Sequence, residues 1–340
     1  MPTSRSPRTR RDALALAGAA GVVRVAGAAG LSLALPARAQ GTYPSRPLRM
    51  IVPLAAASAV DVAARLIAQK MGANMGQTVV VENITGAAGI IGASQLAKAT
   101  PDGYTIGGFN DSILTMVPNL NPATPFNTVT DFAHVSQVAT IDFSISTATN
   151  SPWKSAADFV AAAKANPGKY TYASGGNGSP QHLAGALFAA HTGIDIKHVP
   201  YRGASQAAQD TAGGQCDVTL QGIATVAALA KAGKLKLIGV MLDQRHAEYP
   251  DSPTLKEVGI NGFEFSTWFV LTSPKATPRD IVERLHREVV KALGDGEIQQ
   301  RYAALGLRPT GTTPERTAQL VQEQLTRYGK AIRENNIKGD

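Results

Sequence analysis

The chain has 340 residues, 44% of them hydrophobic, and is therefore long enough to bury the cores of two domains. Its formal net charge of +8 is concentrated at the N-terminus, because residues 1–39 carry six Arg and one Asp; the other 301 residues carry only +3. That balance gives no indication of nucleic-acid binding. The single cysteine, Cys216, excludes an intramolecular disulfide, and its apolar surroundings predict a buried side chain rather than a nucleophile.

The first 39 residues predict an export signal. Four arginines precede an Ala/Gly/Leu-rich stretch, and residues 37–39 (Ala-Arg-Ala) form a small-x-small cleavage site. Arg10 and Arg11 resemble a twin-arginine motif, whereas Arg24 interrupts the apolar stretch, so both the twin-arginine and the general secretory route stay open. We expect a periplasmic protein whose leader is removed after Ala39. The sequence predicts no membrane-spanning helix, which would need about 20 uncharged apolar residues.

Strand-like and helix-like segments alternate after the leader, which predicts an α/β fold with mainly parallel sheets. The first predicted strands are 48–53, 78–82 and 104–108, with helices at 61–71 and in the segment that ends at 99. A second set has strands near 143–147, 170–174, 196–199, 216–221 and 235–242, and helices at 155–165, 180–192, 204–213 and 224–233. A strand at 265–272 and three helices close the chain, the first of them starting at Thr277 and Pro278 and the last at Thr313 and Pro314.

The two sets of segments predict two lobes. The chain crosses between them near residues 140 and 264, so that 40–139 and 264–340 form one lobe and 140–263 the other. A ligand cleft is expected between the lobes, where ligands of α/β proteins usually bind.

One loop indicates what enters this cleft. Residues 174–179 read Ser-Gly-Gly-Asn-Gly-Ser and follow a short strand, and a helix then opens with Ser179 as N-cap and Pro180 at its first position. Glycines let the backbone approach a ligand, and a helix N-terminus favours an anion. The loop therefore predicts a seat for a carboxylate or phosphate. For His182, in the first turn of the helix, a polar contact to the ligand or loop and plain packing both stay open.

Three further loops lead into helix N-termini. Ser58 and Asp61 have the spacing of a capping box, residues 86–92 are rich in glycine, and residues 201–204 read Tyr-Arg-Gly-Ala. Asp61 is expected to cap its helix, to contact a ligand, or to do both through bound water. Four such loops at the carboxyl ends of strands would bring several sets of N–H groups to one cleft.

Catalytic and metal-binding patterns are absent from the sequence. It contains no His-Glu-x-x-His, Cys-x-x-Cys, phosphate-binding-loop or Gly-x-Ser-x-Gly motif, and none of the six histidines pairs with another at metal-ligand spacing. The nearest string to a nucleophile elbow, residues 203–207, ends in Ala, so Ser205 is not expected to be a nucleophile. The sequence predicts a binding protein with no cofactor, no metal and no catalytic residues.

Motifs along nearly the whole mature chain resemble the Bug family, the extracytoplasmic solute receptors of tripartite tricarboxylate transporters. The first is Tyr-Pro-Ser-Arg-Pro-Leu-Arg-Met-Ile-Val-Pro at residues 43–53, and the others are at 79–83, 97–105, 174–187, 198–203, 213–218, 232–235 and 249–254. The resemblance runs from Tyr43 to Asp340, in order and without large gaps. It implies a type II periplasmic-binding-protein fold that closes on a small carboxylate or similar anion.

The resemblance also implies which residues hold the ligand, largely through backbone N–H groups and ordered water. They come from the loop after the first strand, from the Ser/Gly/Asn loop and from the Tyr-Arg-Gly segment, with a strand end on the far wall. The implied set is Pro53, Leu54, Ala55, Ala56, Ser58, Asp61, Ser174, Gly176, Asn177, Gly178, Ser179, His182, Tyr201, Arg202, Gly203 and Gln221.

Two departures from the family pattern affect this site. The family usually has a Gly-rich run where this chain has Ala57 and Ser58, and an Asn where it has Ile90. Side chains at these positions predict a narrower, more apolar pocket floor, and a positive φ there becomes costly.

The resemblance implies a monomeric receptor that passes a small organic anion to membrane permease subunits. A sensory module that contacts a sensor kinase is an alternative that the sequence leaves open. A secreted hydrolase is the other alternative, and the absence of a catalytic triad or metal set argues against it.

Overall fold

The computed structural model describes residues 43–335 and 337, so the predicted leader lies outside the described residues. The first elements follow the predicted order, with α1 longer at both ends than expected. They are β1 (Leu48–Val52), α1 (Ala59–Met75), β2 (Val79–Asn83), η1 (Ala87–Gly89), α2 (Ile90–Ala97) and β3 (Thr105–Asn110). The chain then forms a π-helical turn, η2 (Ser112–Met116), and a short helix, α3 (Val117–Leu120), neither of which the sequence predicted.

The second set of predicted elements is also present. It consists of β4 (Phe132–Ala148), α4 (Ala156–Ala165), β5 (Thr171–Ser174), α5 (Pro180–Thr192), β6 (Lys197–Pro200), α6 (Ala204–Ala212), β7 (Val218–Gly222), α7 (Ile223–Lys231) and β8 (Leu235–Val240). The short helix η3 (Lys256–Val258), which was not predicted, follows. The chain closes with β9 (Ser266–Pro274), α8 (Arg279–Leu293), α9 (Gly296–Ala303), β10 (Leu307–Pro309) and α10 (Pro314–Glu334).

The described strands form one ten-stranded sheet whose main path runs β2-β1-β3-β9-β4-β7-β5-β6, with β8 and β10 also paired to β4. The outer pairs, β1 with β2 and β3, and β5 with β6 and β7, are parallel. Every pairing of β4 and β9 is antiparallel. The prediction of mainly parallel sheets is therefore wrong for the centre, because β4 and β9 run in opposite directions through it.

Strand β4 connects the two halves of the sheet. Its residues up to Asp142 pair with β9, and from Phe143 onward they pair with β7 and β8. The predicted strand covered only the second part of this 17-residue element. The first part contains buried polar residues that obscure the strand pattern: Ser136 Oγ donates to the Thr312 carbonyl at 2.9 Å, and the Gln137 N–H donates to Thr312 Oγ1 at 3.0 Å.

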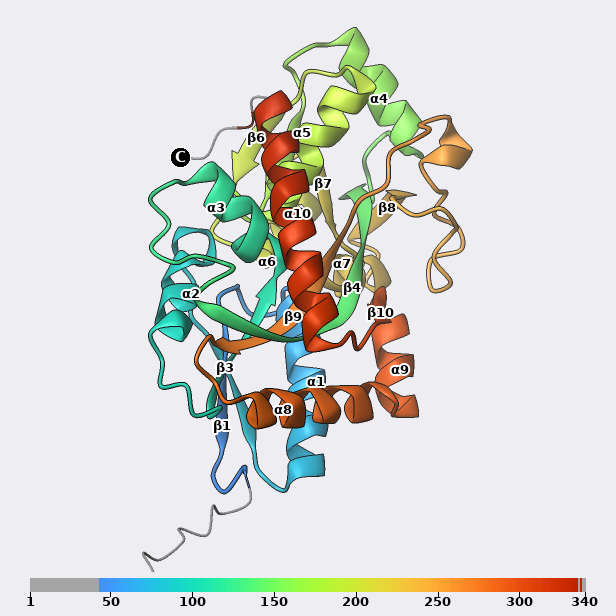
Figure 1. The fold of residues 1–340 in the computed structure, drawn as a ribbon. Helices are drawn as coiled ribbons and strands as arrows, with labels where there is room; N and C mark the ends of the chain where they lie inside the picture. The colour runs from blue at the N-terminus through green and yellow to red at the C-terminus, as the bar shows by residue number, and fades with distance from the viewer. Residues whose placement is uncertain (1–42, 336, 338–340) are drawn as a thin grey trace, which may run out of the picture. The chain divides into compact units, whose positions relative to one another are not determined.

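Helices cover the sheet and fix the loops at its strand ends. In Figure 1, α10 is the long helix that packs along β4 and η2, and α8 packs against α1. Two helix starts match the prediction closely, since Ser179 and Thr313 are both N-caps followed by proline. No helix in residues 43–335 is long and apolar enough to cross a membrane.

Candidate functional site

A cavity of about 510 Å³ opens where the predicted loops meet. Its walls come from the loops after β1 and β2, from η1, η2 and α3, from the loop between β5 and α5, and from the starts of α6 and α7. Eleven of the sixteen predicted site residues line it: Pro53, Leu54, Ala55, Ser58, Gly176, Asn177, Gly178, Ser179, Tyr201, Arg202 and Gly203. Five do not: Ala56, Asp61, Ser174, His182 and Gln221.

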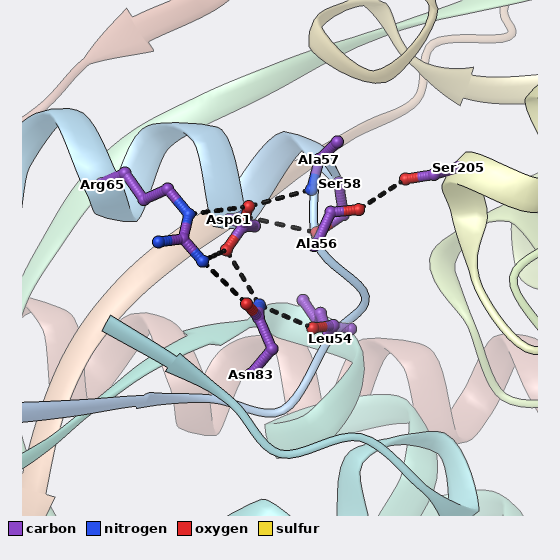
Figure 2. A network of polar contacts seen from close by, with 8 residues as sticks. All are labelled: Leu54, Ala56, Ala57, Ser58, Asp61, Arg65, Asn83 and Ser205. Atoms are coloured by element: carbon purple, nitrogen blue, oxygen red, sulfur yellow. Dashed lines mark hydrogen bonds and ion pairs between the residues drawn. The ribbon is translucent and has the colours of Figure 1, made fainter. Parts of the chain in front are cut away.

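The Asp61 side chain stabilises the loop after β1 through hydrogen bonds. Figure 2 shows its carboxylate between Arg65 and Asn83: Oδ1 accepts from Asn83 Nδ2 at 2.8 Å, and Oδ2 accepts from the Ala57 N–H at 2.9 Å and from Arg65 Nε at 3.1 Å. Asn83 Nδ2 also donates to the Leu54 carbonyl at 3.0 Å. The Asp61 side chain is only 3% exposed. Its contacts therefore favour support of the loop, and contact with a ligand stays a prediction.

The capping box at this loop is only half formed. Ser58 Oγ accepts from the Asp61 N–H at 3.3 Å, as a box requires, but the Asp61 carboxylate binds the N–H of Ala57 rather than that of Ser58. The Ser58 N–H donates instead to the Ala55 carbonyl. The shift by one residue occurs because Ala57 is left-handed, with φ of +59°, which turns its N–H toward the carboxylate.

Of the positions where the chain departs from the family pattern, only Ala57 has a positive φ; Ser58 and Ile90 have negative φ, of −69° and −56°. Besides Ala57, the left-handed residues include Ala87 and Ala88, at +46° and +52°, in the loop that faces the same cavity. A left-handed alanine costs roughly 1–2 kcal/mol relative to the right-handed conformation. At Ala57 the hydrogen bond to Asp61 helps to maintain this conformation.

The Ser/Gly/Asn loop is held by its own neighbours. Ser174 Oγ accepts from the Gly176 N–H at 3.1 Å, His182 Nδ1 accepts from the Gly178 N–H at 3.2 Å, and Ser179 Oγ accepts from the His182 N–H at 3.2 Å. The His182 ring also stacks on His198, with ring centroids 4.2 Å apart. Of the alternatives for His182, the geometry favours contact with the loop together with packing. The predicted anion seat has fewer free N–H groups than its sequence suggests.

The Tyr-Arg-Gly segment brings the start of α6 to the cavity. The Tyr201 N–H donates to the Ser174 carbonyl, which joins this segment to the Ser/Gly/Asn loop. Gln221 is fully buried beneath the helix, and its Nε2 donates to the Ala204 carbonyl at 2.8 Å. Arg202 is exposed and, among the described residues, is the only charged side chain in the cavity lining. Cys216 is buried, 4% exposed, as expected.

Two hydrogen bonds join the segment 56–59 to α6 and α7. Ser205 Oγ donates to the Ala56 carbonyl at 2.8 Å (Figure 2), and the Ala59 N–H donates to Thr225 Oγ1 at 3.0 Å. The hydrogen bond to the Ala56 carbonyl gives Ser205 a structural role. The sequence analysis had considered this residue only as a nucleophile. Thr225 was not predicted at all, although its place in the first turn of the helix after β7 offered a signal.

The largest missed part of the site lies after β3. Asn110, Ser112, Val117, Leu120 and Asn121 all line the cavity. Asn110 ends β3, and side chains at the carboxyl ends of parallel strands are candidates for ligand contact. The short α3 carried no recognisable helix pattern.

Among the described residues, no group of three or more His, Cys, Asp or Glu side chains is placed to hold a metal ion.

Comparison with known proteins assigns this architecture to a family. The model of the tripartite tricarboxylate transporter family receptor matches residues 63–337. The chain belongs to this receptor family. Among curated relatives of the receptor, a protein in the tcbD-tcbE intergenic region of Pseudomonas sp. strain P51 is 36% identical, covering 92% of this chain and 94% of the relative. BugT of Bordetella pertussis is 32% identical, covering 87% and 91%.

Solved structures agree with the assignment. The periplasmic binding protein BugD is 30% identical to the receptor, with a TM-score of 0.83 over 88% of this chain and all of BugD. MatC from Rhodopseudomonas palustris, solved with malate, is 29% identical, with a TM-score of 0.80 over 85% of this chain and all of MatC. An R. palustris protein solved with adipate is also 29% identical, with a TM-score of 0.84 over 87% and 99%. The receptor therefore has the two-lobed α/β fold of periplasmic binding proteins, and the enzyme alternative does not apply.

Proposed function

We propose that this receptor captures a small carboxylate in the 510 Å³ cavity and delivers it to a permease of the tripartite tricarboxylate type. The observation that carries the proposal is the charge of the lining. Within residues 43–335, the lining contains one arginine, Arg202, and no Asp or Glu. An anion entering this cavity meets a positive group and no repelling carboxylate.

Backbone dipoles add to this preference. Helix α6 starts at the cavity and has no side-chain cap, because its N-cap is Gly203. The N–H groups in the first turn of a helix lack partners within the helix and carry a partial positive charge. Arg202 directly precedes the N-cap, Gly203, so its side-chain charge and the helix dipole act on the same region. The malate and adipate bound to two of the structural neighbours are anions of the proposed class.

We infer that the chain forms two lobes with the predicted boundaries and that the ligand contacts both. Residues 40–139 and 264–340 make up the first lobe, and residues 140–263 make up the second. The change of partner within β4, between Asp142 and Phe143, supports a crossing at this level. The start of β9 at Ser266 supports the second crossing. Two crossing strands leave the lobes able to rotate, and an anion held by loops from both would favour the closed form.

We also infer that the receptor acts as a monomer in the periplasm after removal of residues 1–39. The leader sequence, with Arg10 and Arg11, supports export to the periplasm and has no bearing on the oligomeric state.

A thermal-shift screen of the processed protein, followed by calorimetry, tests the proposed function. Organic acids should raise the melting temperature, and Arg202→Gln should weaken binding of the best acid about tenfold or more. Arg287→Gln is the matched control, since Arg287 is an exposed arginine of α8 away from the cavity. Equal affinities for the two variants would contradict the assignment of Arg202, and a screen without any binding acid would contradict the proposed function.

A further inference from the structure

We propose that Asn110 selects ligands by charge: its amide N–H groups donate to an oxygen of the bound acid and offer nothing to an ammonium group. This role rests on the proposed function and narrows the ligand class to acids without an amino group. Asn110 is the last residue of β3 and lines the cavity, with only 4% of its surface exposed. A polar side chain buried this far needs partners for its hydrogen-bonding groups, either in the protein or in a ligand.

The orientation of the Asn110 amide follows from two hydrogen bonds. The Ile113 N–H donates to Oδ1 at 3.3 Å, and Ser112 Oγ donates to the same atom at 3.0 Å. A backbone N–H can only donate, so the atom that it meets is the oxygen and the other one is Nδ2. Both acceptor positions of Oδ1 are therefore used. Nδ2 has no hydrogen-bond partner among the described residues and is not enclosed by them, so its N–H groups are left for a ligand in the cavity.

The acidic residue next to Asn110 does not bring a negative charge to the cavity. Asp111 is fully buried and does not line the cavity, and Tyr328 Oη donates to its Oδ2 at 3.3 Å. Burial raises the pKa of the Asp111 carboxyl well above its ordinary value, which favours the protonated, neutral form. A neutral Asp111 neither repels an anion beside Asn110 nor attracts a cation there.

Other polar groups of the lining also favour a ligand that accepts hydrogen bonds. Three hydroxyl oxygens already accept from a backbone N–H, and each hydroxyl keeps its own proton to donate. They belong to Ser58, Thr225 and Ser179, and their donors are the N–H groups of Asp61, Ala59 and His182. Carbonyls of the lining loops have internal partners as well: the carbonyl of Leu54 accepts from Asn83 Nδ2, and those of Ala55 and Gly176 accept from the N–H groups of Ser58 and Ser179.

An ammonium group in this cavity would lose its water of hydration and gain no carboxylate partner from the described residues. It would also share the cavity with the positive charge of Arg202. An acid of the same skeleton without the amino group avoids both penalties. The expected preference for the acid is about tenfold or more, and tenfold corresponds to about 1.4 kcal/mol.

Calorimetry with two matched pairs of ligands tests this inference on the processed protein purified from the periplasm. The pairs are succinate with aspartate and 3-phenylpropionate with phenylalanine. The tighter-binding acid should exceed its amino counterpart about tenfold or more in affinity. Asn110→Asp keeps Oδ1 for Ile113 and Ser112 but replaces the N–H donors with a carboxylate oxygen. This variant should bind the acid about tenfold or more weakly and should show a smaller preference over the amino acid, since an ammonium group gains a partner.

Asn127→Asp is the matched control. Asn127 is exposed and outside the cavity lining, and its Oδ1 also accepts from two N–H groups, those of Val129 at 2.9 Å and Thr130 at 3.1 Å. The control makes the same change of charge at an amide held in the same way, and it should leave both affinities unchanged. Asn110→Ala removes the donors without adding a charge, and it should also weaken binding of the acid about tenfold.

The outcomes separate this inference from the proposed function. Equal or tighter binding of the amino acids by the wild-type protein would overturn the exclusion of ammonium groups and leave carboxylate capture intact. Wild-type affinity for the acid in both Asn110 variants would overturn the role of Asn110. Absence of binding by all four ligands would contradict the inference, and the wider screen of acids would then decide the proposed function. The wild-type comparison does not depend on the folding of any variant.

Discussion

Replacement of Ser179 by alanine separates helix capping from ligand binding. Ser179 Oγ accepts from the His182 N–H at 3.2 Å, so the hydroxyl still has its own proton to donate to a carboxylate. The residue lines the cavity. Thr313 provides a matched control: it is also an N-cap followed by proline, and its Oγ1 accepts from the Arg316 N–H at 3.2 Å. Thr313 is exposed and does not line the cavity.

Each alanine variant should lose one cap, worth about 1 kcal/mol of stability. For a chain of this size that corresponds to a decrease in melting temperature of roughly 2–4 °C. The Ser179 variant should also lose one hydrogen bond to a charged ligand, about 1.5 kcal/mol, which is roughly tenfold in affinity. Calorimetry with the tightest-binding acid measures the second effect, and urea unfolding without ligand measures the first.

The reasoning predicts similar stabilities and different affinities for the two variants. Pro180 and Pro314 remain in place, so both helices should still start at the same residue. Equal affinity of both variants and wild type would show that the Ser179 hydroxyl does not contact the ligand. A much larger loss of stability at Ser179 would show that this loop depends on the serine beyond its cap.

Three further predictions concern other parts of the chain. Thr225→Val removes the acceptor of the Ala59 N–H and should lower the free energy of unfolding by about 1 kcal/mol in urea titration; an unchanged value would mean that water replaces the bond. Burial lowers the pKa of His134 to about 4, so the stabilisation associated with the neutral ring should be complete above pH 6.5 and lost between pH 6.5 and 4. His134→Gln should reduce this pH dependence of the free energy of unfolding by on the order of 3 kcal/mol. The same pH dependence in the variant and the wild type would contradict the assignment. Lysine at both Arg10 and Arg11 should leave uncleaved protein in the cytoplasm, whereas normal export would assign the general secretory route.

Local signals in the sequence were sufficient for most elements. Two of the three Pro-led helix starts, at Ser179 and Thr313, appear where the prediction placed them, because capping and fixed φ act within a few residues. The third differs by one residue: α8 begins at Arg279 with Pro278 as its N-cap, and Thr277 does not cap it. The first half of β4 was missed for the opposite reason. Its buried Ser136 and Gln137 are satisfied by Thr312, 175 or more residues later in the chain, and no local pattern reports such a partner.

For the functional site, too, the sequence predicted only what local signals determine. The loops that line the cavity were recognisable from glycine, Ser/Thr caps and the family motifs, but side-chain direction within them was not. Asp61 and His182 belong to predicted loops and turn away from the cavity to hold backbone N–H groups. Val117 and Leu120 line it from a four-residue helix that only tertiary packing stabilises.

A crystal structure of the processed receptor with its tightest-binding acid tests the central claim most directly. The account predicts a carboxylate in the cavity, beside Arg202 and the first turn of α6 and within reach of Ser179. A ligand bound outside this cavity would contradict it, for example in the 360 Å³ pocket that Lys275 and Arg279 help to line.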